Sequence, residues 1–348
     1  MRAESLVEYG KPLKQTESQT PRPTGAQVLV KVTHCGVCHS DVHIQDGYFD
    51  LGQDKTLDVR HLRNLPFILG HEIAGTVEAL GPEANGIEIG ARRVVYPWIG
   101  CGECANCARG AEHYCSQSRH LGLNCDGGFA EYVLVAHPRY LIDYGDISPG
   151  LAGTYMCSGL TAFSALKQLG EPQKKDTLLL VGLGGVGMMG LNFAKALFAA
   201  NIIVADIDEA KLDHARAQGI TAYNTQETGV FKKILTETGG GVFGAADFVG
   251  SEHSLNFAFN CLSKGGKVIV SGMFGGTFSL PVVMFPIRVR GIMGSFIGSL
   301  EDAHEMMALV RAGKVPPIPL EERSLHDASK TLDDLRAGKI VGRVILRP

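Results

Sequence analysis

The chain has 348 residues, of which 45% are hydrophobic and 20% charged, a composition typical of globular proteins. Its 33 lysines and arginines stand against 36 acidic residues, which gives a formal net charge of −3. This balance argues against a partner such as nucleic acid or an anionic membrane, because binding either one requires a basic face. The length predicts two domains, since a single core rarely grows to this size.

Targeting and cysteine usage predict the compartment. No apolar run approaches the roughly 20 residues of a membrane span. The first eight residues contain an early acid and no apolar core of a signal peptide. Four of the nine cysteines fall between positions 101 and 115. Without a secretory signal, such clustering favours metal ligation over disulfides, so we expect a protein of the reducing cytoplasm with no membrane partner.

The first chemically dense segment follows a predicted strand over residues 26–32. Residues 34–43 contain two cysteines, three histidines, a serine and an aspartate. Thiols and imidazoles suit zinc, and a nearby carboxylate can orient a histidine ligand. A polar turn between two strands, with Cys35 and Cys38 as small hydrophobic residues, is the alternative interpretation. This segment alone does not separate the two.

A second candidate ligand follows a polar and irregular run over residues 47–65. His71 and Glu72 come directly after Gly70, at the entry to a β-like run. A histidine at the end of a strand is usually a structural residue. Taken with Cys38, however, His71 supplies a second ligand of suitable softness for zinc.

The next motif is the most specific in the sequence. Its spacing, C-x2-C-x2-C-x7-C, is formed by Cys101, Cys104, Cys107 and Cys115. Four thiolates can close around one tetrahedral zinc and leave no position for a substrate, so this zinc is predicted to be structural. Chance clustering or two disulfides are the alternatives, and the cytosolic context disfavours both.

One more cysteine is a candidate metal ligand. Residues 127–135 predict a turn and a strand that close the first domain, and Cys125 before them is interpreted as a bystander. Residues 151–169 have helical spacing and contain Cys157. An isolated buried cysteine is usually a small apolar residue. Its position just before a new sequence pattern keeps Cys157 as a candidate third ligand.

The new pattern predicts a dinucleotide site. An apolar strand over residues 177–181 leads into G-x-G-x-x-G and then a helix over 188–199. The first glycine permits the turn, the second lets the backbone approach a pyrophosphate, and the third allows close packing of helix on strand. The free amides at the helix N-terminus favour the anion. The predicted contacts are Gly182, Gly184, Gly185, Val186 and Gly187.

The expected acid follows at the end of a second buried strand over residues 202–206. Asp206 lies 24 positions after Gly182 (206 − 182), near the roughly 20 of this motif. Its carboxylate would accept hydrogen bonds from the adenosine ribose and repel a 2′-phosphate, so NAD is favoured over NADP. The positive charge of Lys211 would weaken the preference for NAD over NADP but would not reverse it. The alternative role for Asp206 is the N-cap of a helix over 208–218.

Further alternation of strands and helices predicts a doubly wound α/β domain. Strands are expected at 245–250, 266–272 and 290–296, with a helix at 254–262. Two helices, at 300–312 and 325–336, precede a closing strand at 343–346 that returns to the first domain. The predicted division is 1–158, 159–293 and 294–348.

Taken together, these motifs resemble those of the zinc-containing alcohol dehydrogenases of the medium-chain dehydrogenase/reductase superfamily. G-V-C-H-S-D-x-H, G-H-E, the four-cysteine lobe, the late cysteine and G-L-G-G-V-G occur in the family's order over essentially the whole chain. The resemblance implies a GroES-like β-rich catalytic domain and a Rossmann coenzyme domain. It also implies two zinc ions per subunit and reversible hydride transfer between an alcohol and NAD, giving an aldehyde or ketone.

The resemblance also implies roles for individual residues. The catalytic zinc would be held by Cys38, His71 and Cys157, with Glu72 beside the metal. Asp41 would orient the histidine ligand, Ser40 and His43 would form a proton relay, and His39 would contact the cofactor phosphate. Trp98 would form a wall of the substrate pocket, with a plain core role as the alternative.

Departures from the family's pattern leave the substrate open. Cys38 and His71 are 33 positions apart (71 − 38), because residues 50–63 form an insertion near the expected mouth of the pocket. The chain lacks the extra loop that marks dimeric members, so a homotetramer is expected.

Three other functions are alternatives to this one. A polyol- or aldehyde-specific dehydrogenase is disfavoured by Cys157, because polyol-type relatives tend to have a carboxylate there. A non-catalytic cofactor-binding protein on the same fold would have little reason to keep the ligand and relay residues together. A zinc-ribbon interaction module joined to a nucleotide sensor is disfavoured by the acidic balance.

Overall fold

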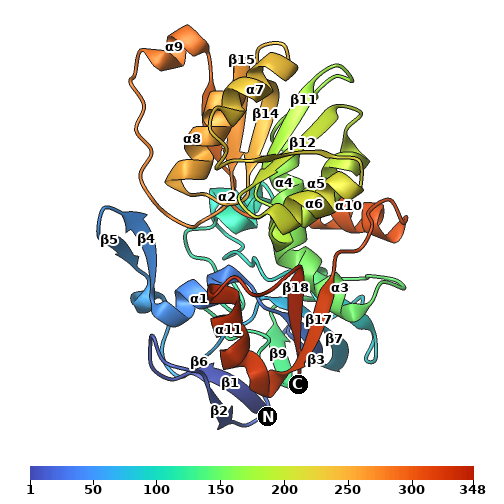
Figure 1. The fold of residues 1–348 in the computed structure, drawn as a ribbon. Helices are drawn as coiled ribbons and strands as arrows, with labels where there is room; N and C mark the ends of the chain where they lie inside the picture. The colour runs from blue at the N-terminus through green and yellow to red at the C-terminus, as the bar shows by residue number, and fades with distance from the viewer. The chain divides into compact units, whose positions relative to one another are not determined.

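The computed structural model describes residues 1–348 and is shown in Figure 1. The chain divides into two compact units, each described below by itself. The first contains residues 1–48, 58–160 and 298–348, and the second contains 49–57 and 161–297. None of the helices is both long and apolar enough to cross a membrane.

The first unit is built on two β-sheets. The larger has seven strands in the order β10 (Leu141–Ile142), β8 (Arg92–Val95), β7 (Glu72–Leu80), β3 (Val28–Gly36), β18 (Arg343–Arg347) and β17 (Leu320–Ser324), with β9 (Tyr132–Val135) also paired to β3. The smaller has the order β2 (Lys14–Glu17), β1 (Arg2–Leu6) and β6 (Phe67–Ile68). The predicted β-rich first domain is therefore confirmed.

Short helices connect these strands. They are α1 (His39–Asp46), η1 (Arg60–Leu62), α2 (Ala105–Ala108), η2 (Glu112–Tyr114), η3 (Pro138–Tyr140), α3 (Pro149–Thr154), η4 (Tyr155–Gly159), α10 (Leu300–Arg311), η5 (Leu325–Asp327) and α11 (Ala328–Arg336). Helix α1 falls where a polar turn was one of the two interpretations, and it ends at Gly47, whose φ of 86° is left-handed. Strand β18 pairs antiparallel with β3, so the chain's last strand does return to the first unit, as predicted.

The second unit is a six-stranded parallel sheet. Its order is β13 (Thr221–Asn224), β12 (Asn201–Asp206), β11 (Thr177–Val181), β14 (Val242–Asp247), β15 (Leu262–Val270) and β16 (Gly291–Gly294). Its helices are α4 (Leu160–Lys167), α5 (Gly185–Leu197), α6 (Glu209–Ala217), α7 (Val230–Glu237), α8 (Glu252–Cys261) and α9 (Met284–Arg288). The strand order reverses between β11 and β14, as in a doubly wound dinucleotide-binding fold. The predicted Rossmann domain is confirmed, although β15 begins four residues earlier than expected, at Leu262 rather than 266.

The predicted irregular run over 47–65 was wrong for its first half. Strands β4 (Tyr48–Gly52) and β5 (Lys55–Asp58) form a two-stranded hairpin there, and its residues 49–57 group with the second unit. Gln53 and Asp54 at the turn have φ of 53° and 58°. Positive φ at both central residues is what a type I′ hairpin turn requires, and glycine or asparagine usually supplies it. The sequence therefore carried no ordinary hairpin signal.

Candidate active site

Three predicted ligands from distant parts of the first unit lie together in its interior. Cys38 precedes α1, His71 precedes β7, and Cys157 lies in η4. Their ligand atoms are buried and lie within 4.8 Å of one another, and the two sulfur atoms are 3.9 Å apart. Two thiolates 2.3 Å from a tetrahedral zinc would be about 3.8 Å apart. The geometry and the chemistry of this donor set therefore fit zinc.

The segment that presents Cys157 is a π-helix. Residues Tyr155–Gly159 are all buried and form this wider turn between α3 and α4. Such turns are rare and occur frequently at functional sites. Here the turn places Cys157 Sγ near Cys38 and the hydroxyl of its neighbour Ser158 on Glu72. The helical spacing of the sequence predicted a helix but not this distortion.

Asp41 fixes the geometry of two ligands at once. Its Oδ2 accepts a hydrogen bond of 2.9 Å from the amide of Cys38, and its Oδ1 accepts one of 3.2 Å from the amide of Gly70. The same Oδ1 lies 3.3 Å from Nδ1 of His71. Both ring nitrogens of His71 are buried and neither makes a hydrogen bond, although Nδ1 lies beside the carboxylate of Asp41. A metal would satisfy the remaining nitrogen, Nε2, which is the arrangement expected of an oriented histidine ligand.

The ligands perturb one another's protonation. The hydrogen bond between the two thiols favours proton loss from Cys38 and lowers its pKa well below the usual value, although burial opposes this. The same hydrogen bond, together with burial and the charge on Cys38, raises the pKa of Cys157 well above its usual value. Burial opposes a charge on His71, yet Asp41 and Cys38 raise the pKa of its imidazole overall. Metal ions bind cysteine as the thiolate, so a deprotonated Cys38 is ready to bind a metal before Cys157 loses its own proton.

Glu72 lies beside this group and is not a member of the three-ligand cluster. Its carboxylate is fully buried, accepts a hydrogen bond from Ser158, and forms an ion pair with Arg343. Burial raises the pKa of Glu72, and the charge of Arg343 opposes that shift. The assignment of Glu72 as a metal ligand therefore stays a prediction. Sequence reasoning missed Ser158 and Arg343, and the only signal was an arginine directly before the apolar residues 344–346.

Trp98 packs against the histidine ligand. Its indole Nε1 donates a 2.8 Å hydrogen bond to the carbonyl of Met156, next to Cys157. Its ring meets the imidazoles of His71 and His120 edge-on, with centroids 5.5 Å and 5.3 Å apart. Because Trp98 is only 1% exposed, its visible role is to hold His71 and η4 in place.

The predicted relay residues lie along α1. Ser40 is buried, with its Oγ 3.9 Å from Cys38 Sγ, and His43 is half-buried three positions further on. Residues three apart share one face of a helix, so both side chains project to the same side. Burial lowers the pKa of His43 and of His39, and the nearby Cys38 opposes each shift. A neutral imidazole at position 43 can accept a proton.

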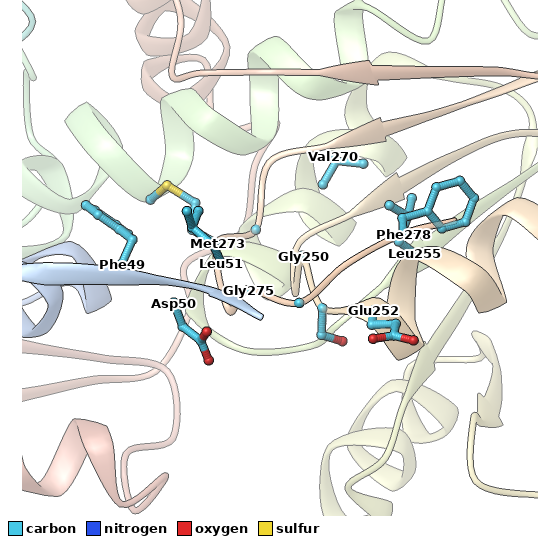
Figure 2. Close-up of a pocket in the computed structure, with 13 residues that line it drawn as sticks. Phe49, Asp50, Leu51, Gly250, Glu252, Leu255, Val270, Met273, Gly275 and Phe278 are labelled. Carbon is cyan, nitrogen blue, oxygen red and sulfur yellow. The ribbon is translucent and has the colours of Figure 1, made fainter. Parts of the chain in front are cut away.

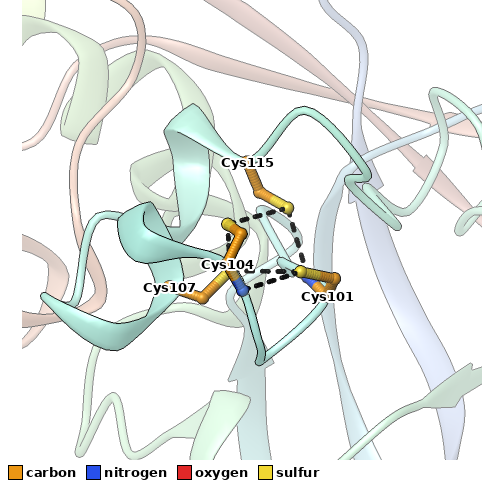
Figure 3. Close-up of side chains that lie close together, drawn as sticks. All are labelled: Cys101, Cys104, Cys107 and Cys115. Atoms are coloured by element: carbon orange, nitrogen blue, oxygen red, sulfur yellow. Dashed lines mark hydrogen bonds between the residues drawn. The ribbon is translucent and has the colours of Figure 1, made fainter.

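The four-cysteine motif closes into a compact cluster (Figure 3). Its members are Cys101, Cys104, Cys107 and Cys115, whose sulfur atoms all lie within 4.8 Å of one another. Three of the sulfur pairs are 3.5, 3.8 and 3.9 Å apart, again close to the spacing around zinc. Backbone amides of Glu103 and Cys104 donate to Cys101 Sγ, and these bonds lower the pKa of Cys101 to about 6. Cys101 is thus prepared for thiolate ligation, whereas burial raises the pKa of Cys107 to about 12.

The glycine turn of the second unit has the geometry of an anion site. Gly182 has a φ of 93°, where side chains are strained, and a Cβ on Gly187 would fall 1.8 Å from the carbonyl oxygen of Gly182. A Cβ on Gly184 would meet no atom within 4 Å, so this glycine faces open space. Gly185 and Val186 begin α5, whose N-terminus suits a pyrophosphate.

Asp206 ends β12 beside this turn. Its carboxylate accepts hydrogen bonds from the amides of Leu183, Ile207 and Asp208, and it is buried. The N-cap of α6 is Asp208, so the alternative capping role falls to that residue. Lys211 lies in α6, with its Nζ 3.5 Å from a carboxylate oxygen of Asp208.

A separate pocket of about 300 Å³ lies in the second unit (Figure 2). Its walls include Phe49 and Leu51 of strand β4, at the start of the predicted insertion, with Val270, Met273 and Phe278 from the end of β15 and the loop beyond it. The backbone of Gly52 approaches Gly276 so closely that a Cβ on Gly52 would lie 2.8 Å from its Cα. Residues 49–52 thus lie at the carboxyl end of the parallel strands, the edge at which such sheets bind ligands.

Fold and sites together define a zinc-type two-domain dehydrogenase, and the comparisons agree. The family model described as "Alcohol dehydrogenase GroES-like domain" matches residues 24–145, and that described as "Zinc-binding dehydrogenase" matches residues 185–312. The chain belongs to the zinc-type medium-chain alcohol dehydrogenases.

Similar proteins align over the full length. An NAD-dependent alcohol dehydrogenase of Sulfurisphaera tokodaii is 38% identical over 355 residues, and one of Saccharolobus solfataricus is 38% identical over 354, each covering 100% of both chains. Among solved structures, an alcohol dehydrogenase of Aeropyrum pernix superposes with a TM-score of 0.90 at 29% identity and covers 100% of both chains.

Proposed function

We propose that this chain is an NAD-dependent zinc alcohol dehydrogenase that binds two zinc ions per subunit and interconverts an alcohol with its aldehyde or ketone. The observation that carries the proposal is the buried group of Cys38, His71 and Cys157. Three protein ligands of this kind with one position left for water or substrate are typical of catalytic zinc. The four-cysteine cluster, with no such position, suits the structural ion.

The chain's residues support each part of this reaction. Zinc would act as a Lewis acid on the substrate oxygen, and NAD would take up the hydride. Asp41 holds the histidine ligand in one orientation. Ser40 takes the hydroxyl proton of the alcohol, and His43, neutral because burial lowers its pKa, accepts it and releases it to solvent. The alcohol thereby loses one hydride and one proton.

Coenzyme choice is supported by the charges near Asp206. A buried carboxylate at the end of β12 accepts hydrogen bonds from the ribose hydroxyls and repels a 2′-phosphate. Lys211 is engaged by Asp208, which reduces its ability to attract that phosphate. His39, half-buried beside Cys38, is assigned to the cofactor phosphate. NAD is therefore the proposed coenzyme.

Assembly with further copies of the chain, as a cytoplasmic homotetramer, is also part of the proposal. Strand β16 is an unpaired edge of its sheet. The segment before it exposes apolar side chains, with Val282 at 82%, Val283 at 58% and Ile287 at 57%. Exposed apolar patches and open strand edges are features of subunit interfaces. Sedimentation of the purified protein tests this: four copies are expected, and a monomer contradicts it.

A coupled screen tests the enzymatic proposal. Reduction of NAD would be followed with primary, secondary, aromatic and polyol alcohols, and with a Cys38→Ala variant as control. We expect NAD-dependent oxidation of at least one of these classes and its loss in the variant. A polyol as the preferred substrate would favour the polyol-specific alternative, and no oxidation of any class would contradict the proposal.

A further inference from the structure

Glu112 is a buried acid in a loop whose side chains are mostly exposed or half-buried. From Cys101 to Cys115, only Glu112, His113 and Cys115 are buried, and Glu112 is 5% exposed. Neither the proposed reaction nor the proposed coenzyme site uses this carboxylate. Burying a carboxylate is unfavourable unless nearby groups pair with it, so the partners of Glu112 indicate its role.

Two of these partners belong to the short helix η3, outside the cysteine loop. The hydroxyl of Tyr140 donates a 2.6 Å hydrogen bond to Oε2 of Glu112, and the guanidinium of Arg139 pairs with Oε1 at 2.9 Å. The carbonyl of Tyr140 accepts a 2.8 Å hydrogen bond from the amide of Tyr96, directly after β8. Hydrogen bonds to a charged group are roughly twice as strong as neutral ones. The carboxylate therefore attaches the cysteine loop firmly to the body of the first unit.

The third partner lies against the cysteine cluster itself. The amide of Gly100, which precedes Cys101, donates to Oε2 of Glu112 over 3.2 Å. A Cβ at position 100 would lie 2.4 Å from Cys107 Sγ and 3.3 Å from Cys115 Cβ. The backbone of Gly100 is thus packed against two of the predicted ligands, and the carboxylate of Glu112 fixes its position.

The backbone of Glu112 fixes the other end of the loop. Its carbonyl accepts a 3.0 Å hydrogen bond from the amide of Cys115, which caps η2. Cys101 and Cys115 are 14 positions apart, yet Glu112 contacts the backbone at or beside each of them. Gathering four cysteines costs conformational entropy, so a residue that holds both ends of the loop lowers the cost that metal binding must overcome.

We propose that Glu112 is a positioning residue for the metal of the four-cysteine cluster: it joins both ends of the loop to η3, which shortens the stretch of chain that the ion itself must order. This inference rests on the proposed structural zinc. The alternative is a purely structural role, in which Glu112 only contributes to the stability of the whole unit. The two roles differ in which metal ion is lost faster when the carboxylate is removed.

The test uses zinc-loaded, full-length protein and follows the release of zinc to an excess of a coloured chelator. Two phases of release are expected, and the phase that remains in Cys38→Ala belongs to the four-cysteine cluster. The variant is Glu112→Ala. Its matched control is Glu4→Ala, which removes another buried carboxylate of the first unit, one that lies 3.1 Å from a ring nitrogen of His326. The urea midpoint of each protein is measured beside its release rates.

For Glu112→Ala we expect release from the four-cysteine cluster to become roughly 10- to 100-fold faster, the range by which metal affinity falls when a supporting residue is changed. Release from the other site should not change. Glu112→Gln should restore slow release, because its amide oxygen can still accept hydrogen bonds from Gly100 and Tyr140. Glu112→Asp keeps the charge but is too short to reach both partners, so it should also release faster, and it decides the matter if Glu112→Ala does not fold.

The outcomes separate the two proposals. If no phase of release survives Cys38→Ala, the structural zinc is wrong and the positioning role falls with it. If that phase is present and is equally slow in Glu112→Ala and Glu112→Asp, the positioning role alone is wrong. Faster release of both ions from Glu112→Ala, reproduced by Glu4→Ala at an equal fall in urea midpoint, also overturns it, because lost stability of the whole unit gives that result.

Discussion

At the scale of single residues, Asp41 is the group on which the metal geometry depends most. It is completely buried and contacts the backbone of Cys38, the backbone of Gly70 and the ring of His71. Three contacts from one carboxylate link α1 to the entry of β7. A change in this side chain should therefore affect the catalytic metal more than the fold around it.

The change Asp41→Asn tests this role. The amide keeps the shape but weakens the acceptor facing His71, so zinc affinity at this site should fall by roughly 10- to 100-fold. Competition with a chelator measures the affinity. The matched control is Asp46→Asn in the same helix, whose carboxylate pairs with Arg336. Equal zinc retention in the two variants would show that Asp41 does not support the ligand.

His43 should govern the pH dependence of alcohol oxidation. Burial lowers the pKa of His43, so its ring accepts protons above that pKa and loses the ability as pH falls through it. His43→Gln removes the acceptor, and we expect slower oxidation mainly below neutral pH, where hydroxide is too scarce to replace it. Initial rates across a pH series provide the measurement. An unchanged profile counts against His43.

The sequence predicted residues whose partners are near in the chain better than those whose partners are far. The four cysteines and the glycine turn each lie within a short segment, so their spacing alone carried the prediction. Ser158 and Arg343 meet Glu72 across 86 and 271 residues. No local pattern encodes such a meeting, and only the pairing of β3, β7 and β18 creates it.

At the scale of elements, apolar runs predicted five of the six strands of the parallel sheet, whereas β13, α7, α9 and two unusual turns were not predicted. The π-helix η4 is indistinguishable from an ordinary helix in sequence, because every residue from 151 to 166 is buried and no polar face marks the shift that an extra residue causes. The β4–β5 hairpin escaped because Gln53 and Asp54, not glycine, adopt positive φ. Of the two, η4 presents Cys157 to the proposed metal site.

The four-cysteine lobe should depend on its metal for order. Between Cys101 and Cys115 only the short α2 and η2 form, and few side chains there are buried. Cys104→Ser should remove one zinc per chain and expose this loop to proteolysis, because zinc binding supplies the folding energy that the lobe lacks. Limited proteolysis with metal analysis measures both effects. Unchanged zinc content and resistance would contradict a structural zinc here.

His120 should make the fold sensitive to acid. Burial lowers the pKa of this histidine to about 4, and the charges of His113 and His71 add to that. Its folded pKa lies below the unfolded value of about 6.5, so the unfolded chain binds more protons as pH falls. The contribution of His120 to the free energy of unfolding is fully present above pH 6.5. It is lost as the pH falls toward 4, which lowers the unfolding free energy by at most about 3 kcal/mol.

Urea unfolding at several pH values measures this decline. His120→Gln should flatten the loss of unfolding free energy between pH 6.5 and 4, whatever its effect on stability at neutral pH. An equally steep loss in the variant would assign the acid sensitivity to other groups.

At the scale of the whole molecule, the two kinds of zinc site are the central claim. One site combines three ligands from Cys38, His71 and Cys157, and the other closes four cysteines from a single loop. Both lie in the first compact unit, and the glycine turn that suits NAD lies in the second. The fold therefore separates metal binding from coenzyme binding along the chain.

The measurement that tests this claim most directly is the zinc content of the purified protein and of its Cys38→Ala variant. We expect two zinc ions per chain in the unchanged protein and one in the variant, because the four-cysteine cluster does not depend on Cys38. A value near one that is unaffected by Cys38→Ala would contradict the catalytic site.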